Sequence, residues 1–259
     1  MLASVGDILV WLAAGLLFPL TLLPLASLAG GRMKSALVFL ALVAAVAGGS
    51  ILFAHLAVDI DPPRAPPGLL VTAGVSVAAL AALAASGGAA ALIARLSMLI
   101  EKIVRSAGRM SIFLILAMAA IQFTTVILRY VFGVNLIAMQ ESVTYLHGAV
   151  FLLAGGYALL TDDHVRVDIF YRDASPRRKA LTDLAGTYLF LLPFCFVALW
   201  AAAPYVANSW AVREGSVEQS GIRGVYLLKT LIPIYLTLLA LAGFVAAARA
   251  AKTLAGKDG

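Results

Sequence analysis

Carboxylates and an imidazole cluster in the stretch TDDHVRVDIFYRD at residues 161–173. Side chains of these types bind divalent metal ions, and four lie close together: Asp162, Asp163, His164 and Asp168. The alternation in VRVDI places His164, Arg166 and Asp168 on one side, where the guanidinium would repel a cation. Hydrolysis would need a nucleophile positioned beside a base, and the sequence shows no such set of residues. We therefore interpret the stretch as a structural loop and expect no metal and no enzymatic activity.

Two histidines raise a second kind of chemistry, haem ligation. His55 and His147 both lie toward the outer ends of predicted membrane spans, and two facing histidines at similar depth can ligate haem iron. Such ligands usually lie well inside a helix bundle, so packing or a loop contact is the more ordinary explanation. We expect no cofactor, and a haem-binding anchor subunit of a redox complex stands as the alternative function.

The composition indicates the class of protein whose elements must position these residues. The 259-residue chain is 63% hydrophobic and 12% charged, whereas a soluble domain carries about 25% charged residues. We therefore expect an integral membrane protein. The net charge of +6 reports topology in such a chain and does not indicate a nucleic-acid partner. The lone Cys195 excludes an intrachain disulfide.

The chain is predicted to be all-α, with about seven transmembrane helices. A bilayer core of about 30 Å needs roughly 20 apolar residues of helix. Seven stretches meet this requirement: 8–29, 36–58, 69–94, 111–128, 142–160, 184–207 and 230–248. Most of the 19 Lys and Arg residues then fall on one set of loops, which places the N-terminus in the periplasm and the C-terminus in the cytoplasm.

Two basic segments are predicted at the membrane surface. RLSMLIEKIVRSAGR, at residues 95–109, carries apolar residues on one helical face and cations on the other, as interfacial helices do. A plain extension of the following span is the alternative. The second segment follows Ser175, a predicted N-cap, and Pro176 at the first helical position. Both segments are expected to contact lipid headgroups or the surface through Arg95, Lys102, Arg105, Arg109, Arg177, Arg178 and Lys179.

The interiors of the predicted spans contain no Asp, Glu, Lys or Arg. Because intramembrane charges commonly mark ion and substrate pathways, the chain is poorly equipped to transport a solute alone and is expected to serve a partner. Small residues four apart offer surfaces for close helix packing: Ala44/Gly48, Ala45/Gly49 and Ala81/Ala85.

Arg129 and Glu141 bracket a predicted hairpin between two spans. They either form an ion pair with each other, or each side chain reaches toward water.

Several motifs, taken in order, resemble the small membrane subunit of tripartite ATP-independent periplasmic (TRAP) transporters, the DctQ-type component. They comprise QFTTVILRYVFG (122–133), Glu141, HVRVDIF (164–170), SPRRKALTDL (175–184) and VYLLKTLIPIYLTLLAL (225–241). The resemblance covers roughly residues 95–250. It assigns structural or subunit-contact roles to the matching positions Arg129, Tyr130, Gly133, Glu141, His164, Arg166 and Asp168.

The resemblance implies a scaffold in the bacterial inner membrane. Its partners would be a large DctM-type membrane subunit carrying the substrate and sodium sites, a periplasmic substrate-binding protein that delivers a carboxylate, and phospholipids. The expected organisation is an N-terminal extension of three spans (1–94), a basic amphipathic interfacial helix (95–110), a four-helix core (111–250) and a cytoplasmic tail (251–259). The extension departs from the usual small subunit.

Overall fold

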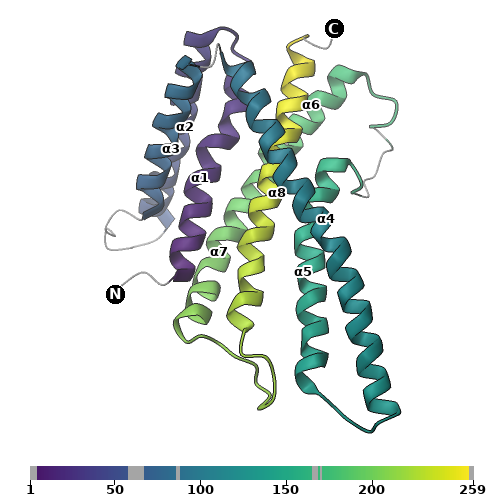
Figure 1. The fold of residues 1–259 in the computed structure, drawn as a ribbon. Helices are drawn as coiled ribbons and strands as arrows, with labels where there is room; N and C mark the ends of the chain where they lie inside the picture. The colour runs from purple at the N-terminus through teal and green to yellow at the C-terminus, as the bar shows by residue number, and fades with distance from the viewer. Residues whose placement is uncertain (1–4, 58–66, 86–87, 165–168, 170, 257–259) are drawn as a thin grey trace. The chain divides into compact units, whose positions relative to one another are not determined.

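The computed structural model describes residues 5–57, 67–85, 88–164, 169 and 171–256, and these residues form helices without strands (Figure 1). The all-α membrane fold is therefore confirmed. Within the described residues, four helices are long and apolar enough to cross a membrane, alongside shorter apolar stretches at Ala13–Ser27 and Thr72–Ala85. The elements are α1 (Val5–Ser27), α2 (Arg32–Ala57), α3 (Pro67–Ala85), α4 (Ala89–Tyr130), α5 (Ile137–Thr161), α6 (Pro176–Gly186), η1 (Thr187–Leu191), α7 (Leu192–Ala211) and α8 (Val225–Leu254).

Helices α1 to α3 coincide with the three spans predicted in the N-terminal extension. One boundary was wrong: the predicted span 69–94 ends as α3 at Ala85, and residues 89–94 belong to α4. Gly88 explains the break, because its φ of +132° is a conformation that residues with a side chain rarely adopt. Helix α4 can therefore start in a new direction immediately after the glycine.

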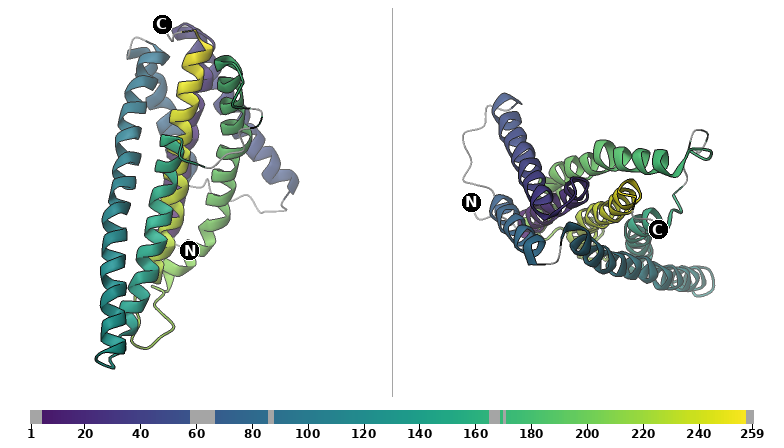
Figure 2. Two further views of the ribbon diagram at one scale, coloured as in Figure 1. Left: turned by 90° about the vertical axis from the view of Figure 1, so that its right-hand side faces the viewer. Right: turned by 90° about the horizontal axis from the view of Figure 1, so that it is seen from above.

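Helix α4 is one continuous element of 42 residues. At 1.5 Å per residue it is about 63 Å long, roughly twice the thickness of a hydrocarbon core. No break separates the predicted surface helix 95–110 from the span that follows, because Arg, Lys, Glu and Leu are strong helix formers. The interfacial position of residues 95–110 stays a prediction. The C-terminal part of α4 runs beside α5 in a long hairpin (Figures 1 and 2).

Helices α6, η1 and α7 follow one another without a break, and the start of α6 confirms the predicted cap. Ser175 is the N-cap, its hydroxyl accepts a hydrogen bond from the Arg178 N–H at 3.4 Å, and proline occupies the first turn. The π-turn η1 widens the helix over Thr187–Leu191. Tyr188, in this turn, donates to the carbonyl of Thr21 in α1 at 2.5 Å. The proline-interrupted α1 thus has a polar contact with the third core span.

The contacts divide the chain into two compact units. One contains residues 1–10, 102–164 and 195–242, and the other contains residues 11–101, 165–194 and 243–259. In the spanning window of α8, 61% of the residues are buried, against 11% in those of α4 and α5. Helices α4 and α5 therefore present most of their surface to the surroundings of the chain.

Gly156 of α5 allows a close approach to the backbone of α8 in the first unit. A Cβ placed on Gly156 would lie 2.9 Å from the backbone carbonyl carbon and oxygen of Leu238 in α8. The small-residue pairs selected from the sequence lie at other positions, and Ala81 and Ala85 are exposed in α3. Their role in packing against a partner stays a prediction.

Candidate functional site

Glu141, in the second turn of α5, holds the loop of residues 212–224 that joins α7 to α8. One carboxylate oxygen accepts a hydrogen bond from the Ser216 hydroxyl, and the other accepts from the Ile222 backbone N–H at 2.6 Å. The loop closes on itself as well, because the Ser216 N–H donates to the Ile222 carbonyl at 3.0 Å. A single carboxylate therefore joins α5 to the α7–α8 connection, and we call this arrangement the loop clamp.

The ion pair considered between Arg129 and Glu141 is not formed in this structure. Arg129 is exposed at the end of α4, with its guanidinium carbon 6.0 Å from the centroid of the Tyr130 ring. The sequence singles out Glu141 as a structural or subunit-contact position, but it does not reveal the partners that Glu141 has in this structure. Ser216 and Ile222 lie more than 70 residues away in the sequence, and no local pattern connects them to α5.

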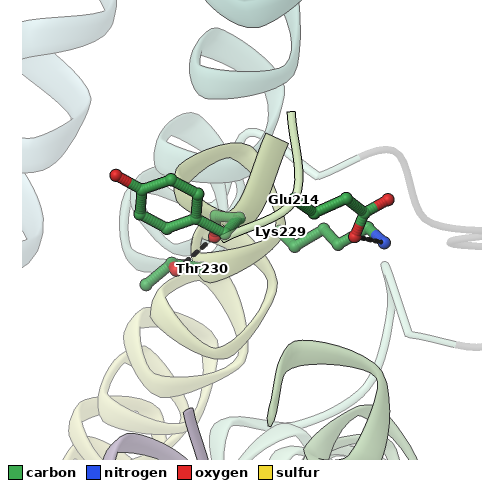
Figure 3. Close-up of polar contacts among 4 residues, drawn as sticks. Glu214, Lys229 and Thr230 are labelled. Carbon is green, nitrogen blue, oxygen red and sulfur yellow. Dashed lines mark hydrogen bonds and ion pairs between the residues drawn. The ribbon is translucent and has the colours of Figure 1, made fainter. Parts of the chain in front are cut away.

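A second tie joins the same loop to α8 (Figure 3). Lys229 donates to Glu214 at 2.5 Å, and its ammonium lies 3.9 Å from the centroid of the Tyr205 ring. The Lys229 side chain is only 14% exposed, so the carboxylate and the ring largely enclose its charge. The hydrogen bond from Lys229 holds the pKa of Glu214 below its ordinary value. The pair fixes the loop where it leaves α7.

Aromatic residues pack next to this ion pair at the junction of α7 and α8. The Trp210 indole N–H donates to the Thr230 hydroxyl at 2.9 Å, and the Trp210 ring meets the Tyr226 ring edge-on at 4.8 Å. Thr230 in turn donates to the Tyr226 carbonyl at 2.7 Å, one of the two dashed contacts in Figure 3. The one sequence signal for this region is Lys229, a cation that directly precedes the apolar span 230–248.

The remaining signature positions surround the hairpin and the stretch after α5. Tyr130 is 79% exposed. Gly133 adopts a φ of +67° where the chain turns between α4 and α5, a conformation that explains the glycine. His164 is exposed. The predicted contacts of Arg166 and Asp168 lie outside the described residues.

Cations occur along the first half of α4 and at the start of α6, as the sequence indicated. Arg95, Lys102 and Arg109 are exposed, and Arg105 is partly exposed. Glu101, between them, pairs with Arg249 of α8 at 2.7 Å. The exposed side chains are available to charged surroundings.

The cations at the start of α6 divide into two kinds. Arg177 and Arg178 are exposed. Lys179 instead donates to the Arg172 carbonyl at 2.9 Å, and its ammonium lies 5.3 Å from the Tyr171 ring centroid. Lys179 therefore also holds the preceding loop.

Neither of the two kinds of chemistry that the sequence raised, metal binding and haem ligation, has a complete set of ligands among the residues that the structure describes. Among the described residues, no three His, Cys, Asp or Glu side chains gather to hold a metal ion. His147 is exposed on α5, and its ring centroid lies 4.9 Å from that of Phe151. The side chain of His55 lies outside the described residues, so the structure does not test the alternative of a bis-histidine haem site.

An open groove runs between α4 and α5. One hollow of about 400 Å³ is lined by Met118, Ala119, Gln122, Val143, Thr144 and His147. A second hollow of about 280 Å³ shares Gln122 and Val143 with the first and continues toward Arg129 and Gln140. We call the two hollows together the α4–α5 groove. Its polar side chains come from both helices, which distinguishes it from an ordinary lipid-facing surface.

Comparison with known proteins agrees with the resemblance in the sequence. Residues 118–253, more than half of the chain, match a protein family described as the DctQ component of tripartite ATP-independent periplasmic transporters. No curated protein matches the chain, and no solved structure does. The matched region contains the loop clamp and the α4–α5 groove, whereas the N-terminal extension lies outside it.

Proposed function

Because this chain belongs to the DctQ family of TRAP transporter components, we propose that it is the scaffold subunit of a sodium-coupled transporter that imports a carboxylate. Its partners are a large DctM-type membrane subunit and a periplasmic substrate-binding protein. The large subunit binds substrate and sodium, and the present chain holds the fixed part of that subunit in the bilayer. The chain itself is not an enzyme.

One observation carries the proposal: the span interiors lack charged side chains. No Asp, Glu, Lys or Arg occurs in residues 110–128, 142–161, 184–211 or 230–248. A coupled carrier of an anion and a cation needs groups of this kind, or broken helices, at membrane depth. Two charges that border these intervals are engaged within the chain, since Glu141 holds the loop and Lys229 pairs with Glu214. Translocation therefore belongs to another polypeptide.

The same proposal includes a topology. The chain is a multi-pass protein of the bacterial inner membrane with a periplasmic N-terminus and a cytoplasmic C-terminus, since Lys and Arg concentrate on the loops that would face the cytoplasm. Residues 95–110 lie at the interface with their cations near phospholipid headgroups. Residues 111–250 form the four-helix core, and the three helices of the N-terminal extension enlarge the scaffold.

Copurification followed by uptake tests the proposal. A tagged chain isolated from its native membranes is expected to retain a larger membrane protein with many spans. Uptake of radiolabelled carboxylates into proteoliposomes is expected to need that protein, the binding protein and a sodium gradient as well as this chain. Full uptake activity from this chain alone would show that it is the transporter and would refute the scaffold role.

A further inference from the structure

The α4–α5 groove contains two polar side chains that lie inside predicted membrane spans without an obvious partner. Gln122 lies six residues, about 9 Å, inside the end of the predicted span 111–128, and His147 lies five residues, about 7.5 Å, inside the start of the predicted span 142–160. Both side chains are exposed. Among the residues that the structure describes, no hydrogen-bond partner faces either of them, and His147 has only its ring contact with Phe151.

Neighbouring hydroxyls show how this chain otherwise treats polar groups on the same surface. Thr124 and Thr125 each donate to a backbone carbonyl one turn earlier, at 2.8 Å. These groups are satisfied within their own helix and tolerate lipid. An amide on Gln122 and an imidazole on His147 cannot be satisfied in this way. In hydrocarbon, each would lose its hydrogen bonds to water without replacement, which is unfavourable.

The polar lining of the groove favours a protein occupant over a lipid. The two hollows share Gln122 and Val143, so they form one continuous groove along both helices. Helices α4 and α5 are also the least buried of the long spans. A lipid acyl chain could fill the volume, but it offers no hydrogen bond to Gln122 or His147. A protein helix with polar side chains satisfies both requirements.

We propose that the α4–α5 groove is the docking surface for a transmembrane helix of the large transporter subunit. That helix presents side chains that exchange hydrogen bonds with Gln122 and His147. The proposal rests on the scaffold role given above and adds the place of contact. Interhelical hydrogen bonds of this kind are the means by which polar residues hold membrane helices together.

Leucine substitutions test the contact without removing bulk. Gln122→Leu and His147→Leu are each expected to lower the amount of large subunit retained per tagged chain by roughly threefold to twentyfold, the range of measured interhelical hydrogen bonds. Thr124→Val is the matched control, because Thr124 is exposed on the same helix but already satisfied. It is expected to retain the large subunit as the unsubstituted chain does. Thermal unfolding of each isolated variant verifies that it is folded.

A photo-crosslinking residue identifies the occupant directly. Placed at Thr144 in the groove, it is expected to form an adduct with the large subunit, whereas at Leu116, which does not line the groove, it is not. An adduct with lipid only, or with a second copy of this chain, overturns the proposal. Unchanged retention by folded leucine variants does so too. If the unsubstituted chain retains no large subunit at all, the scaffold function itself fails.

Discussion

The contact between Gly156 and Leu238 allows a quantitative test of the packing of α5 on α8. A methyl group on Gly156 would lie 2.9 Å from the Leu238 carbonyl carbon and oxygen and 3.0 Å from its Cβ. Ordinary van der Waals contacts begin at 3.4 Å. The atoms in the way belong to the backbone, so no side-chain rotation relieves the overlap. The two helices must move apart by about half an ångström, and this disturbs their shared interface.

Gly186→Ala supplies the reference for Gly156→Ala. Gly186 also lies in a helix, but a Cβ there would meet nothing within 4 Å. Each substitution replaces helical glycine by alanine and gains about 0.5–1 kcal/mol of backbone propensity. This gain cancels when the two variants are compared. The difference that remains is the overpacking cost at Gly156, about 1–3 kcal/mol.

Tryptophan fluorescence during heating in detergent measures this difference. With about 2–4 °C per kcal/mol for a chain of this size, Gly156→Ala is expected to unfold several degrees below Gly186→Ala. Gly148→Ala should fall between them, because the nearest atom there is the end of a leucine side chain at 3.2 Å. If Gly156→Ala unfolds at or above the temperature of Gly186→Ala, the close approach of α5 and α8 is wrong.

Three further predictions concern polar contacts. Glu214 has a lowered pKa in the folded chain, so its pair with Lys229 contributes stability that is complete above the ordinary value of 4.5 and is lost as pH falls through the lower folded value. Acidification is therefore expected to lower the unfolding temperature of the unsubstituted chain more than that of Glu214→Gln. Tyr188→Phe removes the hydrogen bond to Thr21 and is expected to cost about 1 kcal/mol, measured by the same thermal unfolding. Ser175→Ala removes the α6 cap and is expected to cost about 1 kcal/mol and to speed hydrogen exchange at the start of that helix.

Each of these predictions has a reference variant and an outcome that contradicts it. Equal acid sensitivity of the Glu214→Gln and unsubstituted chains would show that the ion pair does not stabilise the fold. Tyr130→Phe, on a ring that is 79% exposed, should have little effect; a loss equal to that of Tyr188→Phe argues against the α1 contact. Ser175→Gly should behave nearly as the unsubstituted chain, since glycine is tolerated at an N-cap.

Local rules predicted much of this fold because they act over short distances. Hydropathy located the four long helices, and the Ser175–Pro176 pair located the start of α6, where the cap forms as expected. The rules left two possibilities at the start of α4. The charged stretch before the span is predicted as a surface helix, with a plain extension of the span as the alternative, and helix-forming residues continue α4 through it without interruption.

The contacts that define the site depend on tertiary structure, and sequence patterns did not reveal them. Glu141 could be selected by its type and position, yet Ser216 and Ile222 meet it only because α7 and α8 return to the start of α5. The same limit applies to Gly156, whose importance comes from its neighbour Leu238 in α8. Spacing identifies residues that can pack closely, but only the arrangement of helices selects those that do.

The unbroken course of α4 gives its two halves a fixed angular phase. Each residue of an α-helix advances the azimuth by about 100°, so the direction of the cations near Lys102 is locked to that of the groove residue Gln122. Inserting one residue between them would swing the cations a quarter-turn or more around the axis. One helix carries both sets of side chains, so the direction of any contact made by these cations is fixed relative to the direction of any contact made by the groove.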